Sequence, residues 1–455
     1  MLSVTVIGGG ITGLASSYFL HKSMPGADIN LYESSGRLGG KVLSNRIGPA
    51  VAEAGPDSVV ARNSTLTDLC RDIGLSDDII YPETSKSYLW ARGKLRPIPE
   101  GIFAGYPSKG LSALRRSGVL TLPGYLRVAL ETLLPRTRIT DDISVGELTR
   151  RRFGIEFKNK LVDPLIGGIM SCSSDHLSAS EVLPGLYSLA KENRSILSTA
   201  GHRLSSAPSP PFFSFAGGIG ELVEKLDSAT TDVRKHTGKA VVSMTTDGTK
   251  WKIRGTDFET VSDAVIQTAP AYEASSMLGP SVPELSSLLS RFRYTTVCNV
   301  VFAYRSGDVD TSIGGSGFLV PEDEGLIMTG CSWLSSKWAN AQAEGLTLIR
   351  CFAGTPDSVS WQKLGDDRLA DTLEKELRGI MNIRGDRLEY RVTRWEKALP
   401  QYSVGHRELV ARCRSLSPPG LYLAGAAYGG VGISSCVADA KRAADSVSAY
   451  LASLA

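Results

Sequence analysis

The chain has 455 residues, of which 42% are hydrophobic and 21% charged, an ordinary balance for a soluble globular protein. At ~150 residues per domain this length makes about three domains, enough to fold without disulfides or a structural metal. A net charge of +3 gives no dense basic surface of the kind that binds nucleic acid. Seven scattered cysteines without a C-x-x-C pair argue against a disulfide framework or a zinc site and favour reduced thiols in the cytoplasm. No signal peptide opens the chain and no apolar run approaches the ~18 residues of a spanning helix, so we expect at most peripheral membrane contact.

A strand, a glycine turn and a helix open the chain. Residues 2–7 are rich in β-branched residues, Gly8-Gly9-Gly10-Ile11-Thr12-Gly13 follows, and apolar residues then recur at helical spacing up to Pro25. A G-x-G-x-x-G motif between a strand and a helix predicts a site for the pyrophosphate of a dinucleotide. Glu33 ends the next predicted strand, 20 residues after Gly13, and is placed to accept the ribose hydroxyls.

A second glycine pair follows this acid. The stretch Arg37-Leu38-Gly39-Gly40-Lys41 resembles the R-x-G-G-[RK] signature of FAD-dependent amine-oxidase-like flavoproteins. Its glycines can bring backbone beneath a cofactor, and Lys41 can offset phosphate charge. The pair of motifs therefore predicts FAD rather than a nicotinamide cofactor.

The middle of the chain alternates between two kinds of pattern. Short apolar and basic segments, separated by Pro and Gly, fill residues 85–205, and Ser144 with Glu147 forms a capping box that predicts a helix. A second helix is predicted over residues 162–170. Strands are predicted at 239–244, 250–254, 264–268 and over much of 291–355, and an amphipathic helix at 366–381.

The C-terminal part repeats the strand, glycine turn and helix arrangement. Residues 420–424 predict a strand, Gly425 and the stretch 428–432 predict the turn, and Ile433 begins a long helix. The N-terminus of such a helix favours an anion or a polar ring edge. We expect the first and last parts of the chain to form one site. The stretch Gly217–Gly220 lacks the spacing of a second dinucleotide motif, so the flavin is expected to be reoxidised most simply by dioxygen.

Together these motifs are similar to those of the protoporphyrinogen/coproporphyrinogen oxidases, oxygen-dependent FAD enzymes of haem synthesis. The resemblance covers essentially the whole chain and is strongest to the Gram-positive coproporphyrinogen III oxidase type. Beyond the dinucleotide motifs it is carried by residues 55–58, 151–154, 164–169, 317–320, 392–395, 400–402 and 405–406.

The resemblance implies an α/β amine-oxidase-like fold. It consists of a discontinuous Rossmann-like FAD-binding domain, a β-sheet substrate domain and a mainly helical insert. The expected boundaries are 1–84, 206–272 and 389–455 for the FAD-binding domain, 85–205 for the insert and 273–388 for the substrate-binding sheet.

The resemblance also implies an activity. Non-covalently bound FAD would oxidise coproporphyrinogen III to coproporphyrin III with dioxygen, removing six electrons and forming three hydrogen peroxide. Protoporphyrinogen IX is the alternative substrate, and another amine-oxidase-like oxidase or desaturase is a more distant alternative. A flavin-free binding module of the same fold conflicts with the intact phosphate loop and Glu33. Expected partners are the porphyrinogen, dioxygen and the next haem-pathway enzyme.

The candidate site residues follow from the motifs and the resemblance. No catalytic side chain and no metal ligand is expected, because hydride transfer is the cofactor's chemistry. The cofactor candidates are Gly8, Gly9, Gly10, Ile11, Thr12, Gly13, Glu33, Ser34, Arg37, Gly40, Lys41, Gly55, Pro56, Asp57, Ser58, Val241, Trp395, Gly425, Val431, Gly432 and Ile433. The substrate candidates are Arg62, Asn63, Gly168, Ile169, Leu319, Ile327 and Trp338, with Lys109 and Arg115 as further basic residues for the substrate carboxylates. The stretch Met170–Ser173 departs from the family pattern, as does Asn63, where relatives often have lysine, and both bear on substrate preference.

Overall fold

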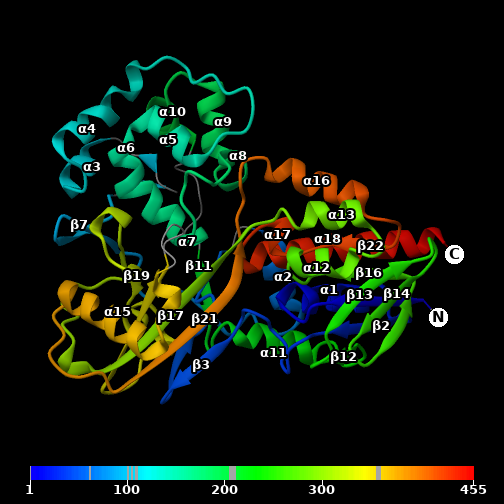
Figure 1. Ribbon diagram of the computed structural model, residues 1–455. Helices are drawn as coiled ribbons and strands as arrows, with labels where there is room; N and C mark the ends of the chain where they lie inside the picture. The colour runs from blue at the N-terminus through cyan, green and yellow to red at the C-terminus, as the bar shows by residue number, and fades with distance from the viewer. Residues whose placement is uncertain are drawn as a thin grey trace.

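The computed structural model describes residues 2–60, 63–99, 102–103, 106–107, 111–203, 212–354 and 360–454. Three parts are distinct in Figure 1. A layered α/β half carries both chain ends, a second sheet lies beside it, and a group of short helices from residues 111–203 packs above that sheet.

The α/β half is built on a parallel sheet with the strand order β12-β2-β1-β16-β22. Its strands come from three separate stretches of the chain: β1 (Ser3–Ile7), β2 (Asp28–Tyr32), β12 (Arg234–His236), β16 (Ala264–Gln267) and β22 (Leu421–Leu423). The side chains alternate between faces. Val4 and Val6 pack under α1 (Ile11–Ser23) and α18 (Ile433–Ser453), whereas Ile7 belongs to the core on the other face.

That other face is covered by an antiparallel sheet and three helices. The strands are β13 (Val241–Thr246), β14 (Trp251–Gly255) and β15 (Glu259–Ser262), and the helices are α12 (Ala271–Leu278), α13 (Pro283–Leu289) and α16 (His406–Leu416). Further small elements of this half are β3 (Ser44–Ile47), β4 (Ala50–Glu53), β5 (Val59–Val60), α2 (Ser64–Asp72), β6 (Ile79–Ile80), β11 (Phe212–Phe215), α11 (Gly220–Ser228) and α17 (Ala426–Gly429).

The second sheet has the strand order β21-β17-β20-β19-β18-β7-β8. Its strands are β7 (Ser87–Ala91), β8 (Lys94–Pro97), β17 (Tyr294–Arg305), β18 (Gly317–Leu319), β19 (Met328–Ser332), β20 (Leu346–Ala353) and β21 (Glu389–Pro400). The helix α15 (Asp366–Ile380) packs on it through Leu369, Leu373 and Leu377, which share one helical face. Residues 389–400, expected in the FAD-binding domain, and residues 87–97, expected in the insert, both pair into this sheet.

The helical group contains α3 (Leu111–Ser117), α4 (Leu122–Ala129), the 3-10 turn η1 (Leu130–Leu133), α5 (Val145–Phe153), α6 (Ile155–Phe157), the π-helix η2 (Lys158–Gly167), α7 (Gly168–Met170), α8 (Ala179–Val182), α9 (Pro184–Glu192) and α10 (Ile196–Arg203). The capping box is confirmed, because Ser144 Oγ accepts a hydrogen bond from the Glu147 N–H at 3.0 Å. The helix predicted over 162–170 begins earlier: η2 is a π-helix with Pro164 inside it, and α7 continues it to residue 170. π-Helical geometry frequently occurs at functional sites.

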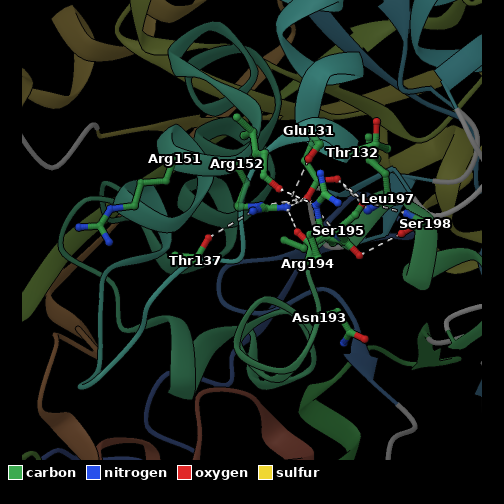
Figure 2. Close-up of polar contacts among 12 residues, drawn as sticks. Glu131, Thr132, Thr137, Arg151, Arg152, Asn193, Arg194, Ser195, Leu197 and Ser198 are labelled. Atoms are coloured by element: carbon green, nitrogen blue, oxygen red, sulfur yellow. Dashed lines mark hydrogen bonds and ion pairs between the residues drawn. The ribbon is translucent and has the colours of Figure 1, made fainter.

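A buried ion pair joins the helices of this group (Figure 2). Arg152 and Glu131 pair directly, and their side chains are 2% and 0% exposed. Glu131 also accepts hydrogen bonds from Ser195 Oγ and the Ile196 N–H, while Arg152 donates to the Pro135 carbonyl. The neighbouring Arg151 points away from the cluster in Figure 2 and pairs with Glu147 instead. Of these two adjacent arginines, Arg152 is the one buried in the network.

In the part of the chain that the structure describes, no helix combines the length and the apolar character that crossing a bilayer requires.

Candidate functional site

Two positions of the turn between β1 and α1 require glycine. Gly8 has φ +102°, and a Cβ atom on Gly13 would lie 1.8 Å from the Gly8 carbonyl oxygen. The N-cap of α1 is Gly10, which has no side chain to cap the helix, so the first N–H groups of α1 stay available to an anion. The loop thus has the geometry of a pyrophosphate site.

Glu33 lies at the end of β2, beside this turn. Its carboxylate accepts hydrogen bonds from the N–H groups of Gly9 and Ser35, both at 2.7 Å. The backbone carbonyl of Glu33 accepts a bond from the Lys239 N–H at 2.9 Å, which brings the start of β13 and Val241 to the same end of the sheet. The predicted ribose acid and adenine-side residue therefore lie close together.

The second glycine loop packs directly on the first. The Gly39 N–H donates to the Gly9 carbonyl at 2.8 Å, and a Cβ atom on Gly40 would lie 3.0 Å from the Cα of Gly10. The Arg37 guanidinium donates to the backbone carbonyls of Leu38 and Gly40 at 3.1 and 2.5 Å. Arg37 therefore shapes the loop through bonds to the backbone of the loop itself.

Lys41 opens toward the same region. Its side chain reaches the surface, and desolvation by the surrounding protein lowers the pKa of its ammonium group. Cys436, at the start of α18, lies near both Lys41 and Thr12, and burial raises the pKa of its thiol to about 11. Lys41, Thr12 and Cys436 come from three distant stretches of the chain and meet at one place.

The Gly55–Ser58 loop is held from the second sheet. A Cβ atom on Gly55 would lie 1.9 Å from the Lys41 carbonyl oxygen. Trp395 Nε1 and Asn299 Nδ2 donate to the Ala54 carbonyl at 2.8 and 2.9 Å, and Arg350 Nη2 donates to the Gly55 carbonyl at 2.5 Å. Trp395, a predicted cofactor contact, thus fixes the backbone next to the predicted cofactor loop.

Buried charges lie behind the same loop. The Asp57 carboxylate pairs with Lys337 Nζ at 2.9 Å; burial alone would raise the pKa of Asp57, but Lys337 and Arg350 outweigh it and lower that pKa. Glu53 accepts from Ser44 Oγ and the Ile219 N–H, both at 2.7 Å, and burial raises its pKa to about 7. Sequence reasoning missed Glu53, Asn299, Lys337 and Arg350, because their partners lie far away along the chain and no local motif marks them.

The C-terminal glycine segment packs against the N-terminal glycine loops. Gly425, Gly430 and Gly432 have φ values of +121°, +126° and +114°. A Cβ atom on Gly425 would lie 3.5 Å from Thr12 Oγ1, so this segment lies against the start of α1. Val431 is half-buried against the helical group, and Ile433 begins α18. The first and last parts of the chain thus lie side by side, as a shared site would require.

The substrate candidates divide into groups. Gly168 and Leu319 face each other, since a Cβ atom on Gly168 would lie 3.4 Å from Leu319 Cδ2. Ile169 beside them is 66% exposed, and Ser171 just beyond has φ +48°, in the left-handed region. Trp338, in contrast, is 2% exposed in a separate core cluster.

The remaining substrate candidates are placed less directly. Ile327 packs on the core of the second sheet. Asn63 Nδ2 donates to the Ser434 carbonyl at 3.4 Å, which ties it to α18. Arg115 is exposed on α3, and Arg62 and Lys109 lie outside the described residues. Their substrate roles stay predictions.

These loops fit FAD. Gly8, Gly13, Gly40 and Gly55 let the loops pack closely, since a Cβ atom at each would lie within 3.0 Å of a neighbouring part of the chain. The helix α1 leaves its first N–H groups open, and Glu33 and Lys41 supply an acceptor and a cation beside it. The Gly425–Gly432 segment lies across the other side of Thr12.

Comparisons with known proteins agree with this geometry. Residues 11–448 match the family described as flavin containing amine oxidoreductase. The coproporphyrinogen III oxidase of Bacillus subtilis is 31% identical, with 98% of each chain covered, and that of Staphylococcus aureus is 32% identical, with 99% of each covered. A crystal structure from Exiguobacterium sp. 255-15, provisionally described as a protoporphyrinogen oxidase, has a TM-score of 0.88 and 30% identity and covers 98% of this chain and 99% of its own.

The chain therefore belongs to the flavin-containing amine oxidoreductases, and it has their fold. It is an oxidoreductase, and its cofactor is FAD. The full-length relatives of 31–32% identity place it beside the coproporphyrinogen III oxidases within that family.

Proposed function

We propose that this enzyme oxidises coproporphyrinogen III to coproporphyrin III with three molecules of dioxygen, releasing three of hydrogen peroxide. The observation that carries the proposal is the end-to-end similarity to proteins named coproporphyrinogen III oxidase, in a chain whose glycine loops pack against one another at the start of α1. Bound FAD supplies the acceptor for each two-electron oxidation, and the protein supplies orientation and exclusion of water.

The residues proposed to bind FAD and the substrate belong to the four loops and to the edge of the helical group. Gly8–Gly13 and Lys41 would hold the phosphates, Glu33 would hold the ribose, and the Gly55–Ser58 and Gly425–Gly432 segments would contact the flavin. The attachment is proposed to be non-covalent, because Tyr428-Gly429-Gly430-Val431 stands where some amine oxidases carry a cysteine for covalent flavin. Acid precipitation should release all of the flavin.

The macrocycle is proposed to lie against Gly168, Ile169 and Leu319. An isoleucine that is 66% exposed beside a half-buried leucine offers the apolar surface that a porphyrinogen needs. Arg62, on the chain just past Ser58, is proposed to bind a propionate with its guanidinium. Arg62→Ala should then raise the Michaelis constant and leave the FAD content unchanged.

The test gives the purified protein each porphyrinogen in air and follows porphyrin fluorescence and peroxide. We expect three peroxides per coproporphyrin and a kcat/KM for coproporphyrinogen III above that for protoporphyrinogen IX. A preference for protoporphyrinogen IX would establish the alternative. Ile169→Glu should lower kcat/KM with coproporphyrinogen at normal FAD content. The matched control is Ile155→Glu, at an isoleucine of similar exposure on α6.

We also propose that the enzyme works in the cytoplasm and contacts a bilayer peripherally. Leu122, Leu126, Leu130 and Leu133 follow one another at helical spacing along α4 and η1, and each is at least 50% exposed. Arg115 and Arg116 on α3 supply nearby exposed positive charge.

Binding to vesicles containing anionic lipid should be lost in high salt and in Leu126→Glu. Pelleting that survives high salt would contradict a peripheral contact.

Transfer of the product to the next haem-pathway enzyme is proposed on the resemblance alone and is testable by co-purification.

A further inference from the structure

Asp439 lies on α18 directly behind the Gly425–Gly432 segment and is only 5% exposed. Its Oδ2 accepts a hydrogen bond from the Gly425 N–H at 2.9 Å. A Cβ atom on Gly429 would lie 2.4 Å from the Asp439 Cβ, so the side chain is packed against the backbone of α17. The carboxylate therefore satisfies a buried donor at the residue where the segment begins.

Two arginines share the other carboxylate oxygen. Arg442 Nε donates to Asp439 Oδ1 at 2.7 Å, and Arg414 Nη2 donates to the same atom at 3.3 Å. Each arginine also donates to a backbone carbonyl of this part of the chain: Arg442 Nη2 to Leu423 at 2.8 Å, and Arg414 Nη2 to Tyr428 at 3.3 Å. One carboxylate thus links the backbone before, at and after the Gly425 turn.

The charge of Asp439 is needed for this arrangement. Desolvation and the nearby positive charge of Arg442 lower the pKa of Arg414, because the two guanidinium groups repel each other electrostatically. Without a carboxylate between them, the two cations would lie beside a buried and unpaired Gly425 N–H.

We propose that Asp439, with Arg414 and Arg442, positions the Gly425–Gly432 segment against the bound FAD. Asp439 is a positioning residue, because it acts through the backbone of Gly425, whose Cα faces Thr12 at the phosphate loop. The proposal concerns the flavin and not the porphyrinogen, so it stands whichever porphyrinogen the enzyme oxidises.

The test compares purified full-length variants that carry FAD. Asp439→Asn keeps the size of the side chain and removes its charge. We expect the Kd for FAD, measured from flavin fluorescence released on dilution, to rise about 10- to 100-fold. The visible absorption of the FAD that stays bound should move toward that of free FAD. Arg442→Gln, on the 39% exposed side chain, should give a weaker change of the same kind.

The matched control is Asp445→Asn, which removes a carboxylate from the same helix where it pairs with Lys441 at the surface. Its Kd and flavin spectrum should equal those of the parent enzyme. A merely structural role for Asp439 would lower the melting temperature equally with and without added FAD, with an unchanged Kd and spectrum, and that result would overturn the proposal. If Asp439→Asn does not fold, an unchanged Kd and spectrum in Arg442→Gln would overturn it equally.

Discussion

The cofactor loops and the helical group differ in the contacts that hold them. The loops combine close backbone packing at glycines with side-chain bonds such as that of Trp395, whereas the helical group relies on a buried side-chain network. In the loops, backbone meets backbone: Gly13 and Gly55 each leave less than 2 Å between a hypothetical Cβ atom and a carbonyl oxygen. In the helical group, buried side chains meet instead, with Arg152 and Glu131 at the centre of a network that joins η1, α5 and α10 (Figure 2). A backbone contact requires a glycine at a set spacing, whereas a side-chain network needs only compatible partners anywhere in the chain.

Gly13→Ala should have the largest effect on the cofactor loops. The added Cβ would lie 1.8 Å from a backbone carbonyl oxygen, which cannot turn away as the end of a flexible side chain could, so the start of α1 must move. We expect FAD affinity to fall at least 1,000-fold, about 4 kcal/mol. Gly36→Ala, in the neighbouring loop but with no atom near its added Cβ, should keep the affinity. FAD content after gel filtration measures both, and a flavin-loaded Gly13→Ala protein would contradict the geometric argument.

The corresponding break in the helical group is Arg152→Ala. It leaves the fully buried Glu131 carboxylate without its cation, which typically costs about 3–5 kcal/mol of unfolding free energy. Arg151→Ala removes a half-exposed pair with Glu147 and should cost under about 1 kcal/mol. Chemical denaturation compares the two. Equal losses would mean that the buried network does not hold the helices.

A pH experiment sharpens the comparison inside the loop region itself. The folded-state pKa of Glu53 is about 7 against an ordinary 4.5, so the folded chain binds this proton more tightly than the unfolded chain. The stabilising contribution is complete below pH 4.5 and is lost as the pH rises through 7, a change of about 3 kcal/mol.

Glu53→Gln cannot titrate. The parent protein should therefore lose stability relative to Glu53→Gln between pH 5 and pH 8, as measured by denaturation at each pH. Parallel stability profiles for the two proteins would assign the pH dependence to other groups.

The smallest expected effect is that of Glu33→Ala. The carboxylate binds two loop N–H groups and is placed for the ribose, and loss of a charge-assisted bond costs about 1.5–3 kcal/mol. FAD affinity should fall about 10- to 150-fold while the fold persists. Isothermal titration with FAD measures the change, and an unchanged affinity would reduce Glu33 to a residue that only connects the two loops.

Particular residues show how far sequence reasoning reached. The motif at Gly8–Gly13, the loop at Arg37–Lys41 and the acid Glu33 were predicted together, and the structure brings them together. Trp395 was placed near the cofactor, but its bond to the Ala54 carbonyl could not be predicted, because the pairing of β21 with β17 decides where the indole lies. Nothing in the sequence separates Ile169 from Trp338 as apolar substrate candidates. Only the folded chain shows that Ile169 is exposed and Trp338 is buried.

The sequence by itself determined the local geometry of this protein: where strands end in glycine turns, which helix carries a capping box, and which acid follows the second strand. These features depend on residues within about twenty positions of one another. The tertiary structure decided which distant side chains support those turns, such as Asp439 and Arg350, and which ones pair inside the helical group, such as Glu131 and Arg152. Burial makes such partners necessary, since a charge or N–H group without water must find one, but no local pattern says where along the chain the partner lies.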